Sequence, residues 1–273
     1  MKRTITTLVA LALAAVACGG AGDSSDTTVA GNPDTVLLTI TSEGGFIPVE
    51  FNLDRMPRYQ LMTDGTLFYQ GPVPAIFPGP MLTNVQVTSL DTAVHDEVLA
   101  LIDELGLPGI DEQIDNSGAE TIADASTEFV TYYDETGTHR LGVYALGLTD
   151  GVNRSPERLL MTELVEILDE ATATGESTPY QPEVLQVAAG PGVAEPGMST
   201  VEPWPLEVAF SDMDEWGAGW RCSSVEGEVV DSLIQVFSEA NQATLWDTGD
   251  EELALRARPL LPGETACGGA PQG

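Results

Sequence analysis

The chain has 273 residues, and its 43 acidic residues outnumber 10 basic ones, which gives a formal net charge of −33. This balance excludes a nucleic-acid binder, because neutralising phosphates requires a basic surface. The sequence has one short apolar run, at the N-terminus, whereas a multi-span membrane protein needs several runs of about 20 residues, so this class is excluded. Hydrophobic residues make up 42% of the chain, so we expect a folded body with a buried core.

The N-terminus has the pattern of a secretion signal. Two basic residues precede an apolar stretch over 8–17, and Cys18 follows. Ala15–Cys18 resembles the lipobox of bacterial lipoproteins, although the third residue before the cysteine is more often Leu in that family. The resemblance implies that residues 1–17 are a signal peptide and that Cys18 carries a lipid anchor at the outer face of the cytoplasmic membrane. The alternative is an ordinary signal peptide cut near Ala17.

Composition divides the rest of the chain into four segments. Residues 18–34 are small and polar, which predicts a flexible tether. We expect an N-terminal lobe over 35–175, a linker rich in proline and glycine over 176–202, and a C-terminal lobe over 203–273. Acidic residues are spread along the whole length, which favours a solvated acidic surface. The alternatives are adaptation to salt, repulsion from an acidic cell envelope or partner, and binding of divalent cations.

Turn signals between β-rich runs predict hairpins in the first lobe. Asp64-Gly65 supplies residues that tolerate positive φ, so the runs on either side should pair. A second hairpin is expected around the turn 134–137. The strand-like segments of this lobe are 35–42, 58–62, 66–69, 84–88, 127–133 and 139–146.

Three segments carry apolar residues at helical spacing. The first, 91–105, begins with Asp91 or Ser89 as its N-cap. The second begins with Ser155 as N-cap and Pro156 at the first helical position. The third is 225–240, and the expected buried stripes are Val94, Val98, Leu101, Ile102 and Leu105; Leu160, Leu164, Ile167, Leu168 and Ala171; and Val229, Val230, Leu233, Ile234 and Phe237.

The C-terminal part adds a strand at 205–210 and a hairpin formed by 245–246 and 253–259, with a further short strand at 184–188 inside the linker. Because hairpins dominate and the helices are apolar on one side, we predict the α+β class. The expected architecture is an antiparallel sheet built from hairpins, with amphipathic helices packed on one face. Two lobes meeting near residue 180 are the favoured division.

The cysteine count predicts a disulfide. If Cys18 is lipidated, Cys222 and Cys267 remain as an even pair. Outside the cytoplasmic membrane such a pair is usually oxidised. Closing a loop of about 45 residues would contribute about 3–4 kcal/mol. The alternative, a reactive thiol, requires a histidine nearby, and both His95 and His139 are distant in sequence.

Several short motifs resemble those of secreted actinobacterial lipoproteins that are uncharacterised. The likeness runs over most of the chain beyond the signal peptide, and it implies location and fold but no activity. The order of strand, helix and hairpin in the first half is also similar to that of small bacterial proteinase-inhibitor domains. The motifs are Glu43–Phe46, the Asp64-Gly65 hairpin, Phe77–Pro80, Val143–Gly147 and Arg258–Pro262 before Cys267.

The sequence contains none of the common catalytic motifs: no Gly-x-Ser-x-Gly elbow, no His-Glu-x-x-His, and no glycine-rich phosphate loop with its lysine. We interpret His95 as a surface residue and His139 as a cross-strand polar contact. The segment 212–217 partly matches a calcium loop, but Trp216 and Ser223 occupy two of its ligand positions. We therefore assign no catalytic residue, no metal and no cofactor.

Aromatic side chains form the candidate partner surface. Trp204 and Trp216 lie in the C-terminal lobe, and Tyr69 and Phe77 lie beside and within the proline- and glycine-rich loop 71–80. Grouped aromatics can bind partners, whereas packing around the disulfide is the alternative for the tryptophans. We expect a non-enzymatic, lipid-anchored binding protein of the cell envelope with an extracellular protein partner. The alternatives are an extracellular peptidase inhibitor that uses loop 71–80 and a hydrolase that uses unidentified carboxylates.

Overall fold

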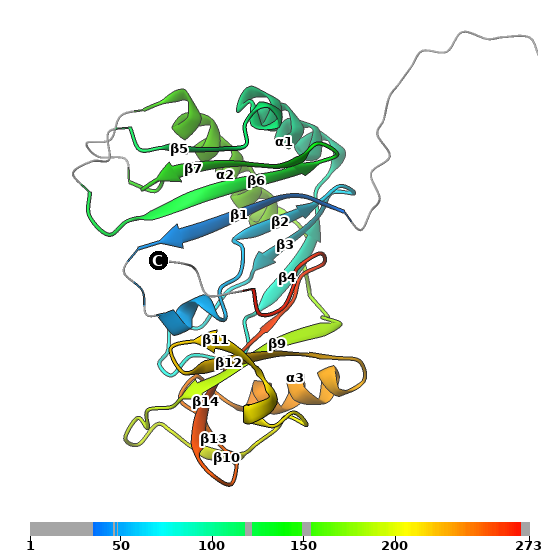
Figure 1. Ribbon diagram of the computed structural model, residues 1–273. Helices are drawn as coiled ribbons and strands as arrows, with labels where there is room; N and C mark the ends of the chain where they lie inside the picture. Colours follow the sequence, from blue (N-terminus) through cyan, green and yellow to red (C-terminus); the bar gives the residue numbers. More distant parts are fainter. Residues whose placement is uncertain (1–34, 46, 48, 118–121, 149–153, 269–273) are drawn as a thin grey trace, which may run out of the picture. The chain divides into compact units, whose positions relative to one another are not determined.

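Two β-sheets, each packed against helices, make up the part of the chain that the computed structural model describes (Figure 1). The described residues are 35–45, 47, 49–117, 122–148 and 154–268. The predicted signal peptide, Cys18 and the predicted tether lie outside these residues, and so does Phe46.

The first sheet has eight strands in the order β5-β7-β6-β1-β2-β3-β4-β8. Neighbours pair antiparallel except β5 and β7, which run parallel at one edge. Gly65 has a φ of 86° and closes the turn between β2 and β3, as the Asp64-Gly65 pair predicts. The strands are β1 (Val36–Gly44), β2 (Tyr59–Met62), β3 (Thr66–Gln70), β4 (Val85–Ser89), β5 (Glu112–Asp115), β6 (Ser126–Asp134), β7 (Gly137–Tyr144) and β8 (Thr178–Pro179).

Helices α1 (Thr92–Glu104) and α2 (Pro156–Thr174) lie together on one face of the first sheet (Figure 1). The Asp91 carboxylate accepts a hydrogen bond from the Val94 N–H (2.9 Å), and the Ser155 hydroxyl accepts one from the Arg158 N–H (3.1 Å). Asp91 and Ser155 are therefore N-caps, as predicted. The core between helices and sheet includes Leu38, Ile40, Leu61, Leu67, Val98, Ile102, Val130, Leu141, Met161, Leu164 and Leu168.

The second sheet has six strands in the order β10-β13-β14-β9-β12-β11, and its one parallel pair is β10 with β13 at an edge. Helix α3 (Val229–Glu239) buries Val230, Leu233 and Phe237 in the core of this sheet. The strands are β9 (Val184–Pro191), β10 (Val201–Pro203), β11 (Asp214–Gly217), β12 (Trp220–Glu226), β13 (Leu245–Asp247) and β14 (Glu252–Pro259). Three short 3₁₀ helices complete the described elements: η1 (Val49–Asn52), η2 (Leu107–Gly109) and η3 (Phe210–Asp212).

The α+β class, the helices, the three hairpins and the strand at 184–188 are confirmed, and two local expectations are wrong. The strand expected at 184–188 forms the first part of β9, which pairs with β12 and β14 at the centre of the second sheet. Residues 205–210 form no strand: the pairing of β10 with β13 ends at Pro203 and Asp247, and a 3₁₀ helix begins at Phe210. The third helix begins at Val229 rather than 225, since β12 runs to Glu226 before the chain turns.

In α2 the buried stripe is shifted from the expected one. Leu164 and Leu168 are buried as predicted, while Leu160 and Ile167 are only half-buried. Met161 and Val165 are buried with them, and so is Arg158, whose guanidinium donates to the carbonyls at the end of β7. The helix therefore presents a slightly different face to the sheet than apolar spacing alone predicts.

Hydrogen bonds join the two sheets within one compact unit. The Gln60 side chain of β2 donates to the Pro262 carbonyl after β14 (2.9 Å). The Gln186 side chain of β9 donates to the Leu53 carbonyl that precedes β2 (2.5 Å). Both glutamines are buried, and their partners satisfy groups that would otherwise lose water without compensation.

The predicted disulfide is confirmed: Cys222 on β12 is bonded to Cys267, with Cα atoms 5.7 Å apart. The bond ties the C-terminal segment back to the second sheet. Trp216, Trp220 and Leu53 form the buried cluster around it. Two of the four tryptophans therefore pack around the disulfide, which was the structural alternative for them.

Candidate functional site

The proline loop, residues 71–80, connects β3 to β4 and is fixed at both ends. At its start the Gly71 N–H donates to the Asn84 carbonyl (2.7 Å), and the Asn84 side chain donates to the Pro72 carbonyl (3.0 Å). At its end the Gly79 carbonyl accepts from the Gln242 N–H (3.0 Å). A Cβ on Gly71 would stand 2.5 Å from the side chain of Gln86, so only glycine fits the start of the loop.

Between these attachments the loop exposes three large apolar side chains. Val73 is 49% exposed, Ile76 is 66% exposed and Phe77 is 68% exposed. The loop also contains four prolines, which fix φ and lack an N–H group. The chain thus holds apolar side chains in water on a segment with little freedom to withdraw them.

The four aromatic residues predicted as a partner surface do not gather in one place. Phe77 is exposed at the proline loop, and Tyr69 is half-buried on β3, where it lines a cavity of about 470 Å³ together with Pro72. Trp204 is half-buried, and its indole N–H donates to the Val208 carbonyl (3.0 Å). Trp216 is buried at 9% exposure, so its inclusion in an exposed surface is wrong: its ring packs beside the disulfide.

Two residues of the loop surface escaped the sequence analysis. Val73 and Ile76 are aliphatic, whereas the partner surface predicted from the sequence contains aromatic residues only. The signal that could have found them is the proline spacing, because apolar residues between prolines in a loop have no regular element that could bury them. The corrected surface is therefore Val73, Ile76 and Phe77, with Tyr69 beside the start of the loop.

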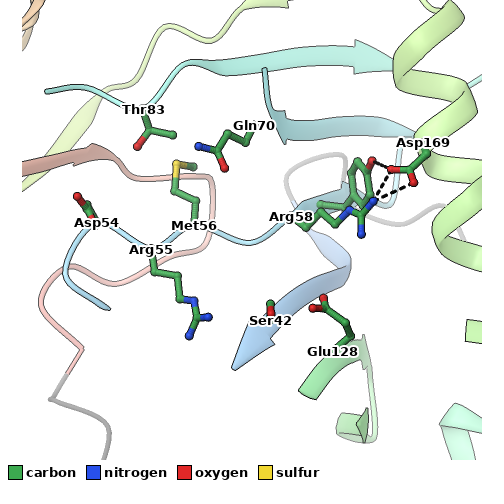
Figure 2. Close-up of a pocket in the computed structure, with 10 residues that line it drawn as sticks. Ser42, Asp54, Arg55, Met56, Arg58, Gln70, Thr83, Glu128 and Asp169 are labelled. Atoms are coloured by element: carbon green, nitrogen blue, oxygen red, sulfur yellow. Dashed lines mark hydrogen bonds and ion pairs between the residues drawn. The ribbon is translucent and has the colours of Figure 1, made fainter. Parts of the chain in front are cut away.

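A polar pocket of about 560 Å³ lies next to this cavity and shares Tyr59 and Gln70 with it. Its residues come from β1, β2, β3, β6, α2 and the segment that leads into β2, so the fold brings together positions far apart in sequence (Figure 2). The lining is Ser42, Asp54, Arg55, Met56, Arg58, Tyr59, Gln70, Thr83, Glu128 and Asp169.

One end of the polar pocket is closed by a three-residue cluster (Figure 2). Arg58 donates to both oxygens of the Asp169 carboxylate at 2.8 Å, and the Tyr59 hydroxyl donates to the same carboxylate. Burial lowers the pKa of Arg58, but the hydrogen bonds and charge of Asp169 outweigh it and raise the pKa above its usual value. Burial and the contact with Asp169 both raise the pKa of Tyr59, so its hydroxyl stays protonated.

At another position in the pocket, Asp54 is paired with Arg256 of β14, with 3.7 Å between Oδ2 and Nη1. Burial raises the pKa of Asp54, and the charge of Arg256 partly opposes that shift. The Arg256 Nε and Nη1 atoms are buried and have no hydrogen-bond partner among the described residues. The pair is thus a charge contact across a short gap rather than a direct hydrogen bond.

The remaining charged groups of the pocket are Arg55 and Glu128. Neither has an ion-pair partner in the part of the chain that the structure describes, and the two do not pair with each other. Figure 2 places the Arg55 guanidinium, Ser42 and the Glu128 carboxylate along the same side of the pocket. The pocket therefore presents one unpaired cation and one unpaired anion to solvent.

The polar pocket contains the carboxylates of Asp54, Glu128 and Asp169. Asp54 and Asp169 lie at opposite ends of the view in Figure 2, and each has an arginine partner. Glycoside hydrolysis by two carboxylates requires both to face one bond. In the view of Figure 2, Asp54 and Asp169 therefore face different parts of the pocket.

The two histidines occupy structural positions. His139 Nδ1 lies 2.7 Å from the Ile110 carbonyl, and its Nε2 lies 3.2 Å from Asp134 across the β6–β7 hairpin. His95 is half-buried on α1, and its Nε2 is buried without a hydrogen-bond partner among the described residues, so its interpretation as a surface residue is wrong. Asp212–Gly217, the calcium-loop candidate, forms η3 and β11, and no cluster of metal-binding side chains occurs within the described ranges.

Comparison with known proteins adds no further assignment. No protein-family model matches the chain, and no curated protein or solved structure matches it. Among the residues placed by the structure, no helix has the length and apolar character needed to cross a membrane.

Proposed function

We propose that this chain is a non-enzymatic binding protein of the cell envelope, held at the outer face of the cytoplasmic membrane by a lipid on Cys18. The proline loop is its contact surface for an extracellular protein partner. The observation that carries this proposal is the exposure of Val73, Ile76 and Phe77 on a loop hydrogen-bonded at both ends.

Physical chemistry supports a contact role for such a loop. Burying an exposed Val, Ile or Phe side chain in an interface gains about 1.5–3 kcal/mol. Ordering a flexible loop normally consumes much of that gain. Here the prolines and the bonds at Gly71 and Gly79 already restrict the backbone, so less entropy is lost on binding.

The test compares partner recovery from cell envelopes by the full-length chain and by loop variants. The double variant Ile76→Ser/Phe77→Ser removes the two most exposed loop side chains, and Val193→Ser is the matched control because Val193 is 78% exposed outside the loop. We expect one protein to co-purify with the wild type and the control, and to fall about tenfold or more with the double variant. Equal recovery with all three chains would exclude the loop as the contact.

The anchor is tested separately. Cys18→Ser removes the only thiol outside the disulfide. We expect this variant to leave the membrane fraction, because the lipid chains supply the membrane affinity. Retention of the variant in washed membranes would contradict the lipid anchor and leave the loop proposal unaffected.

A peptidase inhibitor is the second candidate, and the same loop favours it. A peptidase cleft binds an extended segment whose shape is fixed in advance, and an exposed Phe77 would suit an apolar specificity pocket. Inhibition should then be lost in Phe77→Ser and retained in Val193→Ser. If a panel of secreted peptidases with apolar specificity is unaffected by the wild-type chain, this candidate fails.

A further inference from the structure

The polar pocket contains two kinds of charged group. Arg58 is paired with Asp169, and Asp54 lies next to Arg256. Arg55 and Glu128 line the same pocket without an ion-pair partner within the described ranges. Eight arginines and no lysine follow residue 17. Among the described ion pairs, Arg55, Arg154 and Arg158 have no acidic partner, but Arg154 is exposed and Arg158 donates to backbone carbonyls, so Arg55 differs from both in lining a pocket.

The charges at the pocket balance. Two arginines and three carboxylates line the pocket, and Arg256, which lies outside the lining and pairs with Asp54, supplies the third cation, whereas the chain as a whole is strongly negative. A ligand with a net charge would disturb this balance, but a ligand that carries one charge of each sign would not. The groups concerned are Arg55, Arg58 and Arg256, together with Asp54, Glu128 and Asp169.

We propose that the polar pocket binds a small zwitterion, an amino acid or short peptide, whose carboxylate pairs with Arg55 and whose ammonium group pairs with Glu128. A guanidinium binds a carboxylate through two parallel hydrogen bonds, and a carboxylate accepts from an ammonium group. The ligand thus supplies each side chain with the partner that it lacks.

Neutral groups in the pocket suit the same ligand. The side chains of Ser42, Gln70 and Thr83 line it and make no hydrogen bond to another described residue. They can bond the peptide groups or polar side chain of a ligand. A volume of about 560 Å³ falls within the usual range for small-molecule sites and accommodates a dipeptide.

The experiment measures binding of three related probes to the full-length protein by calorimetry. Gly-Leu carries both charges, N-acetyl-Gly-Leu only the carboxylate, and Gly-Leu-amide only the ammonium group. We expect Gly-Leu to bind about tenfold or more tightly than either blocked form, because each blocked form loses one charge-assisted hydrogen-bonded contact.

Two variants assign the contacts. Arg55→Ala should weaken Gly-Leu binding about tenfold and abolish the preference for Gly-Leu over Gly-Leu-amide. Glu128→Gln should instead abolish the preference over N-acetyl-Gly-Leu. Arg154→Ala and Glu97→Gln are matched controls, since both residues are exposed and lie outside the pocket lining.

Specific binding results would overturn the proposal. Absence of binding by Gly-Leu and by free leucine at millimolar concentration would overturn the proposal, and so would equal binding of all three probes. A loss of binding in the control variants equal to that in the pocket variants would overturn the assignment of the two residues. The proposal does not rest on the proline loop, so Ile76→Ser/Phe77→Ser should bind Gly-Leu as the wild type does.

Discussion

The two sheets are stabilised by different means. The first places its core beneath two helices, and its described residues contain no disulfide. The second has one helix and fewer buried apolar residues, and it is closed by the Cys222–Cys267 bond. A small apolar core leaves little surplus over conformational entropy, so a covalent constraint matters more in the smaller layer.

The largest expected effect tests that constraint. Replacing Cys222 and Cys267 together by serine should lower the free energy of unfolding by about 4 kcal/mol, since the 45-residue separation no longer restricts the unfolded chain. Chemical denaturation with the Cys18→Ser chain as reference measures the change. An unchanged midpoint would contradict the view that the second sheet depends on the bond.

The next effect tests the packing of the first sheet. Leu164 of α2 is fully buried, and Leu164→Ala should cost about 3 kcal/mol by lost transfer energy and a cavity. Leu159 lies on the same helix and is 48% exposed, so Leu159→Ala is the matched control and should cost well under 1 kcal/mol. Thermal unfolding of both variants gives the comparison, and similar losses would show that α2 is not packed as described.

A smaller effect separates the two helix caps. Asp91→Ala should cost about 1 kcal/mol, the usual value for an N-cap. Ser155→Ala should cost more, because the Ser155 hydroxyl also donates to Asp115, the last residue of β5. Denaturation midpoints measure both losses. If Asp91→Ala proves the more damaging, the contact between Ser155 and Asp115 contributes nothing.

The smallest effect is a pH dependence in the first sheet. The bond to the Ile110 carbonyl and the contact with Asp134 raise the pKa of His139 above its usual value of 6.5. Hydrogen bonds from Thr136 and His139 lower the pKa of Asp134 from 3.8 to about 2. The raised pKa of His139 stabilises the fold below pH 6.5, and this contribution is lost as the pH rises through the folded value. The contribution of Asp134 is present above pH 3.8 and is lost as the pH falls toward 2.

The melting temperature should therefore decline slightly between pH 6 and pH 8 in the wild type. His139→Gln should remove this decline, and His95→Gln should leave it in place. A decline that persists in His139→Gln would assign the pH dependence to other groups.

Local signals predicted the parts of the fold that depend on local geometry. Asp64-Gly65 specifies its hairpin because Gly65 needs a positive φ, and Ser155-Pro156 specifies a helix start. The start of α3 was predicted too early, at residue 225 instead of Val229. The reason is that β12 and α3 are both apolar on one side, and only Gly227 marks the turn between them. Arg158 could not be predicted as buried, since its partners are backbone carbonyls at the end of β7, and no side-chain pattern marks them in the sequence.

Residues of the candidate sites could likewise be predicted only where a local sequence pattern marks them. Phe77 could be found because a loop rich in proline is readable in sequence. Arg55 and Glu128 could not be placed in one pocket in advance, since the chain has 43 acids and the two residues line the same pocket only because β6 lies beside β1. The prediction that Trp216 belongs to an exposed surface was wrong for a similar reason: the sequence around a tryptophan near a disulfide does not show whether the ring faces water or the core.

The two attachments of the proline loop belong to different sheets. Gly71 is bonded to Asn84, just before β4 of the first sheet, while Gly79 is bonded to Gln242, which lies between α3 and β13 of the second. The loop thus connects the two sheets, and a partner bound to Phe77 would also restrain the two hydrogen-bonded ends of the loop. A partner that binds the loop only while both of these hydrogen bonds are formed would slow the hydrogen exchange of the Gly71 and Gln242 amides without contacting either residue.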